Sequence, residues 1–206
     1  MVELRKRKAP PPPPAQVKKR TKTKAPATKP KPAEDATPSS TGPVPKVGDV
    51  VSLDGFGGEF ETNDGTKTTL KALVDESESG VVLFTYPKAS TPGCTKQACL
   101  FRDGHDKLTS TGLSIYGLSG DSPKANTTFK MKQNLQYPLL CDPAFTLIGA
   151  IGLKKVPRGT IRGVFVIDKT GKVLILQSGG PDATVEAVRQ MVISTSKDSK
   201  NKNSDT

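Results

Sequence analysis

The stretch Val81–Arg102 reads VVLFTYPKASTPGCTKQACLFR and decides the fold that we expect for this chain. Its first six residues form an apolar, β-branched and aromatic run, which is typical of a strand buried in a sheet. Pro87 ends this strand and opens a polar turn, and from Thr95 apolar residues recur at helical spacing as far as Leu108. The stretch therefore predicts a strand, a loop and a helix, with Cys94 where the helix begins.

The position of Cys94 favours cysteine chemistry. A thiol at a helix start faces unpaired backbone N–H groups and the positive end of the helix dipole, and both favour the nucleophilic thiolate. Cys99 follows five residues later, and in a regular helix the two Cα atoms lie roughly 8 to 9 Å apart. A disulfide needs Cα atoms within about 7 Å. A bond between the two sulfurs therefore requires the first turns of the helix to unwind.

Three residues of this stretch carry a family resemblance. Pro87, Thr91 and Cys94 stand in the pattern P-x-x-x-T-x-x-C that marks peroxiredoxins, and YPKASTPGCTKQAC resembles the bacterioferritin comigratory protein (PrxQ) branch. The similarity runs from about Lys46 to Ile193 and includes LSGDSP, LLCDP and RGVFVIDKTGKV in the family's order. Within that branch, the chain is similar to fungal nuclear thiol peroxidases.

The resemblance implies a thiol peroxidase that reduces hydrogen peroxide and organic hydroperoxides. Cys94 would attack the terminal peroxide oxygen and become a sulfenic acid, and Cys99 would condense with it to an intramolecular disulfide that thioredoxin reduces. The alternative for Cys99 is a small buried core residue. The resemblance implies no cofactor.

The resemblance also assigns partners to the sulfur. Thr91 would supply a hydroxyl hydrogen bond, Pro87 would shield the thiolate, and Arg162 would supply the cation that developing negative charge requires. Gln97 occupies a neighbouring polar position of the family, and Arg158 competes with Arg162 for its role. Without the motif, Thr91 and Pro87 would merely shape a turn and Arg162 would be a solvated charge.

The first 46 residues differ in composition from the rest of the chain. They hold 12 Lys+Arg against 3 Asp+Glu, a net charge of +9, eleven of the 18 prolines, and no Ile, Phe, Tyr, Trp or Cys. Such a segment cannot bury enough apolar surface to fold, so we expect a disordered tail. Its basic clusters, Arg5–Lys8 and Lys18–Arg20, resemble a bipartite nuclear import signal. The alternative is a solubilising tail that contacts nucleic acid nonspecifically.

The remaining chain predicts one α/β domain over residues 47–193 and a polar, disordered end over 194–206. Expected elements are an edge strand near Lys46–Leu53, a hairpin around Asn63–Gly65, a strand at Leu113–Ser119, a helix opened by Ser122-Pro123, strands at Gly163–Asp168 and Lys172–Gln177, and a final helix at Ala183–Ile193. This order fits a thioredoxin-like fold, a mixed sheet flanked by helices.

The remaining reactive side chains suggest no further site. Asp54 and Asp64 stand in turn sequences that suit Asp, and His105 with the cysteines lacks the spacing of zinc ligands, so we expect no metal. Cys141 stands where related chains usually carry serine, and we interpret it as a buried inert thiol, with an auxiliary redox role as the alternative.

Three competing functions follow from these features. The first is a monomeric, thioredoxin-dependent peroxidase. We expect it in the nucleus, where a receptor that binds the tail would import it, and also in the cytoplasm. The second is a chromatin- or nucleic-acid-associated redox sensor with little peroxide turnover. The third, dithiol exchange, is disfavoured because the C-x-x-C spacing is absent. The chain has no run of 18 apolar residues and no apolar signal segment, so we expect no membrane partner.

Overall fold

The computed structural model describes residues 43–202, with side chains as far as Ser196. The basic tail and its import signal lie outside the described residues, apart from residues 43–46, and so does the end of the chain from residue 203. In the described part, no helix has the length and apolar character needed to cross a membrane.

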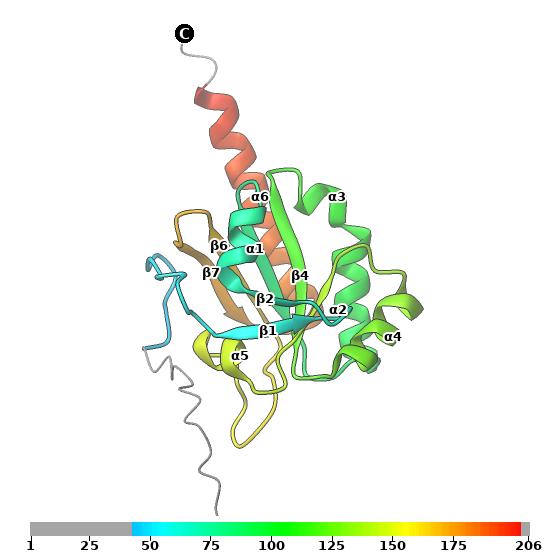
Figure 1. The fold of residues 1–206 in the computed structure, drawn as a ribbon. Helices are drawn as coiled ribbons and strands as arrows, with labels where there is room; N and C mark the ends of the chain where they lie inside the picture. The colour runs from blue at the N-terminus through cyan, green and yellow to red at the C-terminus, as the bar shows by residue number, and fades with distance from the viewer. Residues whose placement is uncertain (1–42, 203–206) are drawn as a thin grey trace, which may run out of the picture. The chain divides into compact units, whose positions relative to one another are not determined.

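A seven-stranded mixed sheet forms the centre of the domain (Figure 1), with the strand order β2-β1-β5-β4-β3-β6-β7. The strands are β1 (Glu59–Thr62), β2 (Lys67–Thr69), β3 (Gly80–Thr85), β4 (Leu113–Ser119), β5 (Leu139–Cys141), β6 (Gly163–Asp168) and β7 (Val173–Ser178). The helices are α1 (Leu70–Glu76), α2 (Pro92–Asp103), α3 (His105–Leu108), α4 (Pro123–Gln133), α5 (Thr146–Ala150) and α6 (Pro181–Lys202). The thioredoxin-like fold expected from the sequence is confirmed.

Strand β3 lies in the middle of the core because both of its faces are apolar. All six of its residues are buried, and it pairs in parallel with β4 and antiparallel with β6. Its side chains alternate between the faces: Val82 and Phe84 pack with α2, α4 and α6, while Val81 and Leu83 pack with α1 and α5. The strand therefore ends beneath α2, and the chain passes directly from the core into the loop that precedes Cys94.

Several predicted elements are confirmed with close boundaries. The β1–β2 hairpin turns at Asn63–Gly65, β4 spans the predicted Leu113–Ser119, and α4 begins after Ser122, whose side chain accepts from the Ala125 N–H. Near the predicted edge strand Lys46–Leu53, the structure has only an isolated bridge between Val50 and Lys172. The predicted strand is thus reduced to a bridge, because among the described residues the segment forms long-range backbone hydrogen bonds only with residues 171–173, through the Gly48 N–H, the Asp49 carbonyl and the Val51 N–H.

Two helices end elsewhere than predicted. The helix of Cys94 stops at Asp103, because Gly104 adopts φ −95° and ψ 1° and interrupts it before the one-turn α3. The last helix does not end at Ile193 but continues to Lys202. Hydroxyls there bond back to the helix, since Ser194 donates to the Gln190 carbonyl at 2.9 Å and Thr195 to the Met191 carbonyl at 3.0 Å. Polar composition alone therefore does not end this helix.

Candidate active site

Cys94 is the third residue of α2 and is 1% exposed. The N–H of Thr95 donates to the Thr91 carbonyl at 2.8 Å and closes the first turn. The Cys94 N–H therefore belongs to the first-turn donors that have no carbonyl within the helix to bond. These donors and the helix dipole favour negative charge at the sulfur. The helix start predicted for Cys94 is confirmed, two residues inside the helix rather than before it.

Arg162 is the cation beside this sulfur. Its Nη2 lies 3.1 Å from Cys94 Sγ. Arg162 immediately precedes β6, whose first residue, Gly163, pairs with Thr85 at the end of β3, so sheet register brings the guanidinium to the start of α2. A Cβ at Gly93 would lie 3.1 Å from Arg162 Nη2 and 3.2 Å from Nη1. The glycine thus leaves room for the guanidinium against the helix.

The competing arginine lies at another place. Arg158 Nη2 donates to the Pro143 carbonyl at 3.2 Å, and its guanidinium carbon lies 5.4 Å from the centre of the Phe145 ring. Of the two arginines that the sequence offers for the cationic position, the structure brings Arg162 to the sulfur.

Gln97 lies behind the guanidinium, one turn along α2 from Cys94, and is fully buried. Its Oε1 accepts from Arg162 Nε at 3.2 Å, and its Nε2 donates to Thr184 Oγ1 at 3.0 Å. Sequence reasoning placed Gln97 near the site by resemblance alone and missed Thr184 altogether. No local signal could have indicated Thr184, because it meets Gln97 only through the packing of α6 against α2.

Thr91 and Pro87 shape the loop between β3 and α2. The Thr91 hydroxyl donates to the Lys88 carbonyl at 3.0 Å, and Pro87 is exposed one residue after the buried Tyr86. The segment that follows β4 also holds the loop, because the Ala89 N–H donates to Asp121 Oδ2 at 2.7 Å. Asp121 is a second residue that sequence reasoning missed. Both motif residues therefore occupy the loop that leads to Cys94, and their predicted contacts with substrate remain predictions.

Cys99 lies in the same continuous helix as Cys94, and neither sulfur is in a disulfide. Cys99 is half-buried, and its Sγ lies 3.6 Å from Gln133 Oε1 at the end of α4. Nearby, Arg102 Nη1 donates to the Gln133 carbonyl at 2.6 Å, and the Tyr137 hydroxyl donates to the Ala98 carbonyl at 2.7 Å. Side chains around Cys99 therefore hold the helix in its wound form.

Comparisons with known proteins identify the chain. Residues 55–175 match the model of the AhpC/TSA family. The chain is 41% identical over 146 residues to peroxiredoxin bcp1 of Schizosaccharomyces pombe, which covers 70% of each chain. The chain belongs to the AhpC/TSA family. It is a peroxiredoxin, a thiol peroxidase and hence an oxidoreductase, and the family implies a hydroperoxide substrate.

Solved structures place this peroxiredoxin near the predicted branch. It superposes on peroxidoxin BcpB of Mycobacterium tuberculosis with a TM-score of 0.65 and 33% identity, over 72% of this chain and 97% of that one. The bacterioferritin comigratory protein of Xanthomonas campestris, studied for its alkyl peroxide reduction activity, gives a TM-score of 0.60 and 27% identity, over 70% and 99%. The resemblance to the bacterioferritin comigratory protein (PrxQ) branch is thus confirmed.

The third cysteine of this peroxiredoxin, Cys141, is fully buried on β5. Burial raises the pKa of its thiol, and the donor Asn126 Nδ2 at 3.2 Å opposes this only in part. A protonated thiol is a poor nucleophile. This environment supports the interpretation of Cys141 as an inert thiol.

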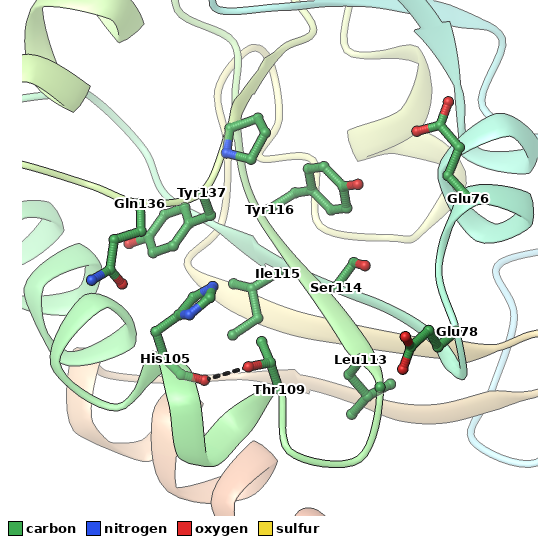
Figure 2. Close-up of a pocket in the computed structure, with 12 residues that line it drawn as sticks. Glu76, Glu78, His105, Thr109, Leu113, Ser114, Ile115, Tyr116, Gln136 and Tyr137 are labelled. Carbon is green, nitrogen blue, oxygen red and sulfur yellow. Dashed lines mark hydrogen bonds between the residues drawn. The ribbon is translucent and has the colours of Figure 1, made fainter.

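A separate pocket of about 470 Å³ lies away from the sulfur. Figure 2 shows Glu76 and Glu78 on one side of it and His105 and Tyr137 on the other. None of the residues that line it belongs to the loop and helix turn around Cys94. This pocket is therefore separate from the surroundings of Cys94.

The remaining acidic and histidine side chains considered in the sequence have protein partners. Asp54 forms an ion pair with Lys71 at 2.8 Å, Asp64 accepts from the Thr66 N–H at 3.1 Å, and His105 Nδ1 lies 3.5 Å from Asp106 Oδ1. Over residues 43–202, no group of three or more His, Cys, Asp or Glu side chains is arranged to hold a metal ion.

Proposed function

We propose that this peroxiredoxin reduces hydrogen peroxide and organic hydroperoxides at Cys94 and is recycled by thioredoxin through a Cys94–Cys99 disulfide. The contact of 3.1 Å between Arg162 Nη2 and Cys94 Sγ carries the proposal. A guanidinium at this distance stabilises the thiolate, and its other N–H groups can bond the peroxide oxygens as charge develops on them.

The first step is a displacement at oxygen. The Cys94 thiolate attacks the terminal oxygen of ROOH, the O–O bond breaks, and RO⁻ takes a proton and leaves as ROH. The sulfur is oxidised to a sulfenic acid and the peroxide is reduced to an alcohol, or to water when R is hydrogen. The Thr91 hydroxyl and the Cys94 N–H would orient the peroxide, and Pro87 would limit the access of water.

The second step joins the two cysteines. The Cys99 thiol attacks the sulfenic sulfur, a disulfide forms and water leaves. Because both cysteines lie in α2, the helix must unwind locally before the sulfurs can meet. The dithiol of thioredoxin then reduces this disulfide by exchange and is itself oxidised.

The deciding experiment follows peroxide consumption with thioredoxin, thioredoxin reductase and NADPH. We expect the wild type to turn over and Cys94→Ser to lose all turnover. Cys99→Ser should consume one equivalent of peroxide and then stall. Turnover of Cys99→Ser at the wild-type rate would show that Cys99 is not the resolving cysteine, and an inactive wild type would overturn the proposed function.

We further propose that the enzyme acts in the nucleus. The support is the sequence of the tail, where Arg5–Lys8 and Lys18–Arg20 are separated by nine residues. A fluorescent reporter fused to residues 1–46 should accumulate in nuclei, and replacing both clusters with glutamine should abolish this. A reporter that distributes evenly between nucleus and cytoplasm would contradict the proposal.

The charge of the tail, +9 over 46 residues, favours a second candidate function. A chain that binds nucleic acid could use its peroxiredoxin domain as a redox sensor with little turnover. DNA binding that weakens steeply with salt and disappears when residues 1–46 are deleted, together with negligible peroxide consumption, would favour this function over the first.

A further inference from the structure

Thr184 is a buried hydroxyl residue on α6 that contacts the candidate active site through one side chain. It is fully buried, and its Oγ1 donates to the Pro181 carbonyl at 2.8 Å. The same oxygen accepts from Gln97 Nε2 at 3.0 Å. Three hydrogen bonds in series thus join the first turn of α6 to the guanidinium that contacts Cys94.

The direction of these hydrogen bonds is determined by chemistry. Because Thr184 has one hydroxyl proton and gives it to the Pro181 carbonyl, it can only accept from Gln97. Gln97 must therefore present its NH₂ to Thr184 and its carbonyl oxygen to Arg162. That orientation matches Arg162, since a guanidinium can only donate. If the Gln97 amide were flipped, its NH₂ group would face the N–H donors of the Arg162 guanidinium.

We propose that Thr184 is a positioning residue for the reaction of Cys94: by orienting the Gln97 amide, it holds the Arg162 guanidinium against the sulfur. The inference rests on the proposed function. The guanidinium lies against Gly93 on α2, and Gln97 Oε1 is the acceptor of its Nε. Without the Thr184 hydroxyl, Gln97 Nε2 is buried and unpaired, and the amide must turn or shift to regain a partner. Either movement withdraws the acceptor of Arg162 Nε.

Two variants separate the hydroxyl from the shape of the side chain. Thr184→Val keeps the shape and removes the hydroxyl, and Thr184→Ser keeps the hydroxyl. We expect Thr184→Val to lower the second-order rate constant of Cys94 oxidation about tenfold and Thr184→Ser to change it less than about twofold. Because the chain has no tryptophan, oxidation is followed by quenched flow and mass spectrometry. Thr184→Ala, which also lacks the hydroxyl, should reproduce the loss.

A matched control separates positioning from stability. Ser77 is another buried hydroxyl, 4% exposed, that donates to a carbonyl three residues earlier, Val74, at 2.7 Å. It ends α1, whose core residues belong to the other face of the sheet. Ser77→Ala should lower the free energy of unfolding by a similar amount and leave the oxidation rate unchanged.

A double-mutant cycle completes the test. In a Gln97→Leu background, Thr184→Val should cause no further loss of rate, because the hydrogen bonds to Arg162 are already broken. Losses that multiply, or a Thr184→Val rate equal to the wild type, would overturn the inference.

If the wild type fails to react with peroxide, the proposed function fails by itself. The rate of Cys94 alkylation by iodoacetamide, mapped by peptide, then tests Thr184: slower alkylation in Thr184→Val than in Thr184→Ser supports positioning, and equal rates refute it.

Discussion

The guanidinium of Arg162 lies 3.1 Å from the sulfur of Cys94, although 68 positions of sequence separate the two residues. The contact exists because β3 and β6 are neighbours in the sheet, so the residue before β6 meets the helix that follows β3. In the proposed function, this cation stabilises the thiolate that attacks the peroxide.

Arg162→Gln should lower the rate constant of Cys94 oxidation by about 100-fold, because it removes a donor and the only charge that contacts the sulfur among the described residues. Arg158→Gln is the matched control, since this arginine contacts Pro143 and Phe145 instead. The measurement is peroxide oxidation by quenched flow. Equal losses in both variants would mean that net charge, rather than the contact, determines the rate.

Tyr137→Phe should loosen α2 beside Cys99. Tyr137 is 2% exposed, and its hydroxyl donates to the Ala98 carbonyl at 2.7 Å. The loss of this hydrogen bond should lower the free energy of unfolding by about 1 kcal/mol. Disulfide formation after oxidation should become faster, because less must be broken before the helix unwinds. Tyr116→Phe, on half-buried Tyr116 of β4, should leave that rate unaltered. An unchanged or slower disulfide step in Tyr137→Phe would contradict this role.

Cys141 should make stability depend on alkaline pH. Burial raises the pKa of its thiol above the ordinary value of 9.0, so the native state holds the proton more tightly than the unfolded chain. The contribution of this thiol to the free energy of unfolding is complete below its pKa in the unfolded chain. It is lost as the pH rises through its pKa in the folded protein. The difference in unfolding free energy between the wild type and Cys141→Ala should stay constant below about pH 8 and shrink above it. Urea titrations between neutral and alkaline pH measure this, and a constant difference throughout would show that the thiol does not ionise more readily on unfolding.

Oxidation should remove helix. If Cys94 and Cys99 join, roughly two turns of α2 unwind, and the circular dichroism at 222 nm should weaken on addition of one equivalent of peroxide. Reduction with dithiothreitol should restore it. Cys99→Ser, oxidised in the same way, should keep its full helical signal. A signal that does not change in the wild type, with the disulfide confirmed by mass spectrometry, would show that the bond closes without unwinding.

Local patterns predicted the elements well. The apolar run of β3, the Ser122-Pro123 start of α4 and the alternation in β4 each reflect a preference that neighbouring residues express by themselves. The ends of helices were harder to predict. Gly104 interrupts α2 although apolar spacing continues to Leu108, and α6 passes Ile193 although the residues beyond it are polar.

The candidate site was predictable only where a motif covered it. Arg162 was found by resemblance, and geometry then distinguished it from Arg158. Thr184 and Tyr137 could not be found, because Gln97 is 87 residues from Thr184 and Ala98 is 39 from Tyr137. Each contact depends on how α2 packs against its neighbours, and a single sequence carries no local record of that packing.

The two halves of α2 are held by different partners: Gln97 is tied to α6, and Ala98 and Arg102 are tied to Tyr137 and to the end of α4. In the proposed cycle, the sulfenic acid on Cys94 lasts until these hydrogen bonds break and Cys99 can reach it. A second peroxide arriving within that interval would drive the sulfur to the sulfinic acid, from which a disulfide can no longer form. The strength of a few hydrogen bonds around α2 would thus determine the peroxide concentration at which the enzyme is inactivated by over-oxidation.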